Sequence, residues 1–135
     1  MEFPKGVGID LRYSGTGDDP TTTWGGLSAA GEIGLSFDMV GTVDALMRNL
    51  AMDLPAVRQP VEPIYFLIAP MTDIAADKAL ASDRAFWVAV QPQTGRVTVS
   101  SNLPQVIPAD ATPAVVVERV RAARASARAA AAIGK

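Results

Sequence analysis

The chain has 135 residues, enough for one domain with a single core, and its 49% hydrophobic and 19% charged residues are typical of a folded protein. It has no Cys and no His, which excludes disulfides, thiolate nucleophiles, Cys/His zinc sites and His-dependent catalytic triads. The net charge of −2 divides unevenly along the chain. Residues 1–112 carry seven basic and thirteen acidic side chains, a net charge of −6, whereas residues 113–135 carry five basic side chains and one acidic side chain, a net charge of +4.

Alternating apolar residues predict a first strand at residues 7–11, and Tyr13 is expected to continue its apolar face. That face consists of Val7, Ile9 and Leu11. Residues 14–31 follow and are rich in Gly, Ser, Thr and Asp, with little apolar periodicity. We expect them to form a long exposed loop that Trp24 anchors.

A first hairpin is predicted next in the chain. Residues 33–37 alternate apolar and small or polar side chains, residues 38–41 provide a turn, and Val43 begins the return strand. Gly41 can take positive φ without steric cost. Residues 44–54 either extend the return strand or form a short helix, because their three leucines also have helical spacing.

The apolar run at residues 64–69 predicts a strand covered on both faces, after a connection that three prolines interrupt. Even when it is extended to Met71, this run has eight residues. A membrane-spanning helix needs about 20, so the sequence as given is expected to be soluble. Residues 72–83 are predicted to be a loop or one short helix.

Residues 86–102, FWVAVQPQTGRVTVSSN, predict a second hairpin whose turn closes on Gly95. Its first strand should place Phe86, Val88 and Val90 on one face and Trp87 and Ala89 on the other. The two hairpins share a form, FDMVGTV and VQPQTGRV, which repeated turn chemistry explains better than duplication. If both glycines need positive φ, Gly41→Val and Gly95→Val should each destabilise by roughly 1–3 kcal/mol.

A C-terminal helix is predicted at residues 114–133 from their density of alanine, with Pro113 at the first helical position and Thr112 as a candidate N-cap. Gly134 is expected to end this helix. Its apolar stripe comprises Val116, Val120, Ala123, Ala127 and Ala130. The chain is therefore divided into an antiparallel β domain at residues 1–112 and a basic, Ala-rich helix that belongs to the same domain or is appended to it.

Arginines share another face of this helix, namely Arg121, Arg124 and Arg128. Together with Trp24 they are candidate contacts with a partner. Nucleic acid is not the favoured partner, because the helix has no aromatic residues between its arginines and the chain as a whole is acidic.

Candidates for catalysis or metal binding are weak. Asp18 and Asp19 could offer oxygen ligands to Ca²⁺, but the spacing of an EF-hand is absent and a solvated loop is favoured. No phosphate-binding glycine motif occurs, and Ser14 and Ser101 have no adjacent base in the sequence. We therefore predict no catalytic residue, no cofactor and no metal, and a small carboxylate enzyme ranks last among the possible functions.

The order of these elements resembles the C-terminal globular part of bacterial prepilin-type proteins, nearest to minor pseudopilins and pilin-like proteins of the GspH/FimT type. The resemblance spans roughly residues 3–102. It is carried by a Pro-Lys-Gly-Val lead into the first strand, by IGLSFDMVGTV, by PIYFLI and by WVAVQPQTGRVTVS. A C-terminal helix like RAARASARAAAAIG also occurs in some relatives.

The resemblance implies an α+β fold, mainly an antiparallel sheet built from hairpins, and a non-enzymatic subunit of a type II secretion or type IV pilus-like system. Its partners would be other pilin-like subunits, and its location periplasmic. The basic leader and apolar helix of that family are not in this sequence, so we expect a longer reading frame or a fragment, with any membrane contact made through the missing segment. The alternative is a free-standing protein-binding module that uses loop 14–31 and the basic helix.

Overall fold

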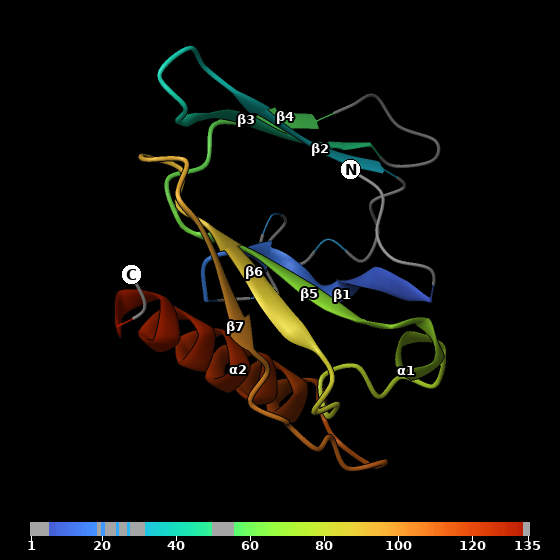
Figure 1. The fold of residues 1–135 in the computed structure, drawn as a ribbon. Coiled ribbons are helices and arrows are strands. Elements are labelled where there is room, and N and C mark those ends of the chain that lie inside the picture. The colour runs from blue at the N-terminus through green and yellow to red at the C-terminus, as the bar shows by residue number, and fades with distance from the viewer. Residues whose placement is uncertain are drawn as a thin grey trace.

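The computed structural model describes residues 6–18, 20, 24, 27, 32–49 and 56–133. They form an α+β fold of two antiparallel sheets and a C-terminal helix, which confirms the predicted class. The elements are β1 (Val7–Thr16), β2 (Glu32–Phe37), β3 (Val43–Asn49), β4 (Ala56–Arg58), β5 (Ile64–Pro70), α1 (Met71–Ala75), β6 (Phe86–Val90), β7 (Val97–Ser101) and α2 (Pro113–Ile133). In Figure 1 the three-stranded sheet lies above the four-stranded sheet and α2 lies below it, which gives three layers.

The four-stranded sheet has the order β1-β5-β6-β7, and the three-stranded sheet has the order β2-β3-β4. All neighbouring strands are antiparallel. β5 lies inside the larger sheet, and its residues 64–69 are all buried, which confirms the strand predicted to be covered on both faces. The smaller sheet comes from the chain between β1 and β5, so it is an insertion between two paired strands.

Each face of the four-stranded sheet has its own hydrophobic core. The core beneath α2 comprises Tyr13, Tyr65, Leu67, Ala69, Ala79, Leu80, Ala85, Trp87, Ala89, Val120, Ala123 and Ala127. The core between the two sheets comprises Leu27, Val43, Ile64, Phe66 and Val90, with Ile9, Leu11, Ile33, Leu35 and Val88 packed against it. β6 therefore sends Trp87 and Ala89 to one core and Val88 and Val90 to the other, as the alternation in its sequence predicts.

The prediction that Tyr13 continues the apolar face of β1 is wrong. Ile9 and Leu11 pack between the sheets, whereas Tyr13 is buried in the core beneath α2. The register of β1 against β5 shifts between Asp10 and Gly15. Extra residues in a bulge break the alternation of faces, so the side chains after the bulge point to the opposite side.

Ser14 satisfies the backbone groups that this bulge would leave without partners. Its hydroxyl donates a hydrogen bond of 2.8 Å to the Asp10 carbonyl and accepts one of 3.0 Å from the Leu67 N–H. The Ser14 carbonyl accepts a further bond of 3.1 Å from the Leu27 N–H. Because Ser14 is fully buried, its hydroxyl replaces ladder bonds that water cannot supply.

Both predicted hairpins are present, as β2–β3 and β6–β7. Gly41 and Gly95 in their turns have φ values of 91° and 70°, in the region that favours glycine. β3 continues to Asn49, so the ambiguous stretch after Val43 begins as a strand. Residues 50–54 of that stretch lie outside the described residues.

Sequence reasoning missed β4, an edge strand of three residues that pairs with β3. Three residues between prolines are too short to show a periodicity, and their pairing depends on a partner elsewhere in the chain. α1, with five residues, lies in the stretch predicted to be a loop or one short helix.

α2 confirms the predicted C-terminal helix, and the helix shares a core with the four-stranded sheet. The Thr112 carbonyl accepts bonds from the N–H groups of Val115 and Val116, at 3.0 and 3.2 Å, as the residue before a helix does. In the predicted apolar stripe, three residues are buried, Val116 is half-buried and Ala130 is exposed. Neither helix in the described part of the chain is long and apolar enough to cross a membrane.

Candidate functional site

The turns of the two hairpins meet each other in space, and we call this contact the hairpin junction. The Val43 N–H, at the start of β3, donates a hydrogen bond of 2.7 Å to the Pro92 carbonyl in the β6–β7 turn. Gly95 packs so closely on the Gly41 carbonyl that a Cβ at position 95 would overlap the carbonyl oxygen. The junction therefore fixes one sheet against the other through backbone groups.

β7 is the edge strand of the four-stranded sheet, and its two valines lie on the face opposite α2, beside Val88 and Val90 of β6. The Arg96 carbonyl accepts a hydrogen bond from the Gln91 N–H, and the Asn102 N–H donates one to the Ala85 carbonyl, so both groups point toward β6. By the alternation of an antiparallel ladder, the backbone groups of Val97, Val99 and Ser101 point away from β6. The side chains of Val97 and Val99 are 53% and 66% exposed.

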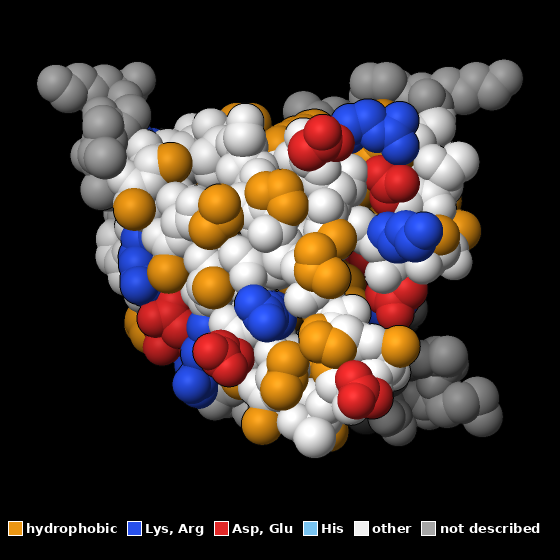
Figure 2. Space-filling view, turned by 90° about the horizontal axis from the view of Figure 1, so that it is seen from below, with side chains coloured by type: hydrophobic (Ala, Val, Ile, Leu, Met, Phe, Trp, Pro, Cys, Tyr) orange, Lys and Arg blue, Asp and Glu red, His pale blue; other side chains and the backbone are white. Residues whose placement is uncertain are grey.

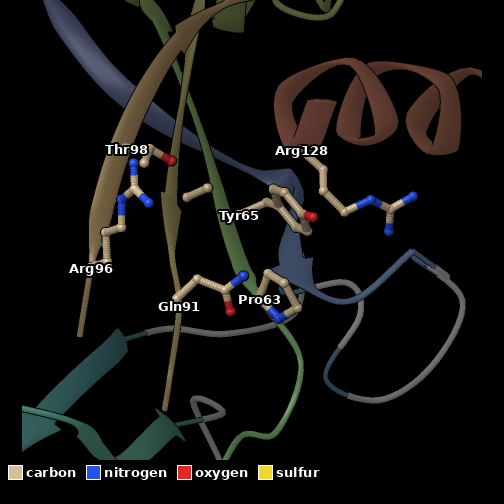
Figure 3. Close-up of a pocket in the computed structure, with 7 residues that line it drawn as sticks. Pro63, Tyr65, Gln91, Arg96, Thr98 and Arg128 are labelled. Carbon is tan, nitrogen blue, oxygen red and sulfur yellow. The ribbon is translucent and has the colours of Figure 1, made fainter. Parts of the chain in front are cut away.

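A pocket of about 170 Å³ lies beside β7, on the face of the sheet that α2 covers. It is lined by Pro63, Tyr65, Ala89, Gln91, Arg96, Thr98 and Arg128. Figure 3 shows Arg96 and Thr98 on one side of the pocket, Tyr65 and Arg128 on the other, and Gln91 with Pro63 at its lower end. Residues of three strands and of α2 thus line one small hollow, and Figure 3 shows the guanidinium group of Arg128 pointing away from Arg96.

Tyr65 is the buried polar group of this pocket. Its side chain is 1% exposed, and its ring packs edge-on to Trp87 with centroids 6.2 Å apart. Its hydroxyl has almost no accessible surface and lies near the side chain of Arg128. Burial raises the pKa of Tyr65, and the nearby charge of Arg128 offsets this only in part.

Arg128 is half-exposed and pairs with Asp18, with 2.8 and 2.9 Å between its Nη1 and the two carboxylate oxygens. The hydrogen bond to Asp18 raises the pKa of Arg128 above its ordinary value. This pair joins the end of α2 to the loop after β1. Asp18 is thus held by an arginine, and its neighbour Asp19, the other calcium candidate, lies outside the described residues.

Arg124 differs from the other two arginines of its predicted face, because its side chain is fully buried. Its Nη2 donates to the Tyr13 carbonyl at 2.7 Å, and its Nη1 donates to the Gly17 carbonyl at 3.0 Å. Its guanidinium also lies 5.8 Å from the centre of the Tyr65 ring. Arg124 therefore holds the bulged end of β1 against α2, and an external partner cannot reach it.

Of the remaining candidate contacts, Arg121 is exposed on α2 and Trp24 is half-buried. The Trp24 carbonyl accepts a bond of 2.8 Å from the Thr16 N–H, which ties the loop to the end of β1. Much of loop 14–31 lies outside the described residues. Figure 2 shows basic, acidic and hydrophobic side chains interspersed on the face that α2 occupies, so the arginines of α2 do not form a continuous basic surface there.

Tyr13 provides a prediction for the pH dependence of the fold. Its hydroxyl donates to Asp77 at 3.0 Å, and burial, with that bond, raises the pKa of Tyr13 to about 12, against about 10 for an ordinary tyrosine. Because the folded-state pKa is the higher one, the stability that depends on Tyr13 is complete below about pH 10 and is lost as the pH rises to about 12.

Tyrosinate absorbance followed against pH, with Tyr13→Phe as the reference, should show one tyrosine ionising near pH 12. The Phe variant should lack that step and should lose less stability than the wild type between pH 10 and 12. A Tyr13 step near pH 10 in the folded protein would contradict the burial and the bond to Asp77.

Comparisons with protein-family models, curated proteins and solved structures give no match. The site is therefore defined by its own residues. Sequence reasoning placed Gly41 and Gly95 in turns but did not foresee that the turns meet, and it missed the pocket. A signal for the pocket was present in Tyr65 and Ala89, which alternate into the same face of neighbouring strands, but the pairing of β5 with β6 was needed to bring them together.

Proposed function

We propose that this chain is a non-enzymatic assembly subunit, of the kind found among minor pseudopilins of type II secretion or type IV pilus-like systems. The proposal rests on the sequence resemblance and on one structural observation, the open apolar edge of β7. The partners would be other pilin-like subunits, and the site of action would be periplasmic.

The segments that carry the resemblance give the hairpin β2–β3, the buried strand β5 and the hairpin β6–β7. They make up most of both sheets and all of the hairpin junction. A scaffold in which two sheets are fixed to each other suits a subunit that must hold its shape under contact from neighbours. This reasoning supports a structural role and assigns no reaction to the chain.

The edge of β7 supports assembly because no strand in the described part of the chain pairs with its outer side, and because its own sequence has no charge or proline to protect it. Residues 97–101, VTVSS, contain no charge and no proline, and two of the five are β-branched valines that are exposed. Proteins that stay monomeric usually blunt such an edge with charges, prolines or a covering loop. A strand from a neighbouring subunit could bond to the outward backbone groups and cover both valines.

Val99→Lys tests this proposal, with Val106→Lys as the matched control. Val99 is 66% exposed on β7 and Val106 is 71% exposed in the connection after it, so neither variant should alter the fold. Binding would be measured by calorimetry against the globular parts of pilin-like subunits encoded in the same genome. We expect Val99→Lys to weaken the complex at least tenfold, and Val106→Lys to leave it within twofold of the wild type.

Two results would count against the proposal. One is that no pilin-like subunit of that genome binds the wild-type chain at all. The other is that a complex forms with equal affinity in Val99→Lys, which would remove β7 as the contact. Circular dichroism of each variant must match the wild type, so that lost binding is separated from lost folding.

A further inference from the structure

We propose that β7 pairs with β7 of a second copy of this chain, so that two four-stranded sheets join into one sheet of eight strands. The two strands are antiparallel and related by a two-fold axis at Val99. In Figure 1 β7 is the outermost strand of its sheet, so the join adds the second copy beyond it. This pairing rests on the proposed function, because it gives the same β7 edge a second copy of the chain as its partner.

The outward backbone groups of β7 are spaced symmetrically about Val99. The N–H and C=O groups of Val97, Val99 and Ser101 point away from β6. With Val99 opposite its own copy, Val97 lies opposite Ser101 of the second copy, so every outward residue meets another outward residue. Each such position exchanges two hydrogen bonds, which gives about six across the join. A shift by two residues in either direction would leave an outward residue of β7 without its partner.

The side chains of β7 contain nothing that excludes a second copy. On a two-fold axis, a charge at position 99 would lie opposite the same charge, and like charges directly opposite each other destabilise a sheet. Residues 97–101, VTVSS, carry no charge. On the α2 face, Thr98 lies opposite Ser100 of the second copy, and hydroxyls in such a pair can bond to each other. Strands that avoid their own copies usually contain a repulsive element, which this one lacks.

The exposed valines of β7 add apolar contact to these bonds. Val97 and Val99 are 53% and 66% exposed, on the face where Val88 and Val90 of β6 pack between the sheets. A two-fold axis perpendicular to the sheet keeps both α2 helices on one face and brings the four valines together on the other. Because such a contact uses the same surface of both copies, it closes at the dimer.

Sedimentation of the full chain between about 1 and 500 µM tests the pairing. It should show a monomer and a dimer in equilibrium, with a dissociation constant of the order of 10 µM, as expected for a small interface. Val99→Lys should weaken the dimer at least tenfold, since it sets two ammonium groups opposite each other. Val106→Lys, at an exposed valine outside β7, should leave it within twofold of the wild type.

Opposite charges test the symmetry of the join. Val99→Glu should weaken the dimer as Val99→Lys does, because two carboxylates then face each other. An equal mixture of the two variants should form a heterodimer, because position 99 faces position 99 and the charges are then opposite in sign. A mixture that stays monomeric while the wild type dimerises would contradict a two-fold axis at Val99.

Cysteine substitutions test the register, since the chain has no Cys of its own. Val99→Cys should form a disulfide-linked dimer under mild oxidation, because opposed residues of an antiparallel pair have Cα atoms about 5.5 Å apart, within the range of a disulfide. Val97→Cys should cross-link with Ser101→Cys but not with itself, because its two copies lie roughly 13 Å apart along the join. Val106→Cys measures the cross-linking that random collision produces.

Self-pairing is wrong if the chain sediments as a monomer over the whole range, if it forms oligomers larger than the dimer, or if Val97→Cys cross-links as readily as Val99→Cys. A chain that stays monomeric but binds a pilin-like subunit would overturn self-pairing and leave the proposed function in place. A dimer that binds no such subunit would support self-pairing and count against the proposed function.

Discussion

Arg124→Ala should lower the free energy of unfolding by about 3–5 kcal/mol, because it removes two charged hydrogen bonds from buried carbonyl groups. The Tyr13 and Gly17 carbonyls that Arg124 binds belong to the bulged end of β1, where regular ladder bonds are missing. Alanine leaves both acceptors inside the protein without donors, and it also leaves a cavity beside the Tyr65 ring. Lysine should rescue only part of the loss, since one ammonium group lacks the fork of a guanidinium.

Arg121→Ala is the matched control, since it removes the same side chain one turn earlier on the exposed surface of α2. Its cost should stay below about 1 kcal/mol, as is usual for exposed charges. Urea unfolding of both variants gives the comparison. Equal losses from Arg121→Ala and Arg124→Ala would show that burial of Arg124 does not contribute to stability in the way we argue.

Gly95→Ala should be the more damaging of the two turn substitutions, with a loss of about 2–5 kcal/mol. Positive φ alone costs an alanine about 1–2 kcal/mol. At position 95 the new methyl group would also overlap the backbone carbonyl of Gly41, which cannot move without disturbing the hairpin junction. Overpacking against backbone adds a further penalty of about 1–3 kcal/mol.

Gly41→Ala separates these two contributions. Gly41 also has positive φ, but a Cβ there would meet no atom within 4 Å, so its cost should be the conformational one of about 1–2 kcal/mol. Thermal or urea unfolding of the pair measures the difference. If Gly41→Ala proves as damaging as Gly95→Ala, the contact between the turns is not what distinguishes the two positions.

Features encoded within a short stretch could be predicted from the sequence. Both hairpins, the doubly covered strand β5 and the helix α2 follow from local alternation, turn residues and alanine content, and each was placed within a few residues. The faces of β6 were also correct, because nothing interrupts the alternation between Phe86 and Val90. The same reasoning failed at Tyr13, where the bulge breaks the alternation and no local residue pattern announces it.

The features that could not be predicted depend on contacts between distant parts of the chain. Arg124 follows helical spacing with Arg121 and Arg128, and only the position of the bulged carbonyls explains why it alone is buried. The hairpin junction requires the relative position of two sheets, which no single segment determines. The pocket likewise combines residues from three strands and a helix.

The pairing of Thr16 with Ile64 has a consequence for how the chain is put together. These residues end β1 and begin β5, and the Gly17 N–H bonds to the Pro63 carbonyl just beyond them, at 2.9 Å. The 47 residues from 17 to 63, which include the whole smaller sheet, thus leave and return at adjacent points. Such a segment can change its length or be replaced during evolution while β1, β5, β6, β7 and α2 keep their places, provided that its replacement still covers the apolar face of Ile64 and Phe66.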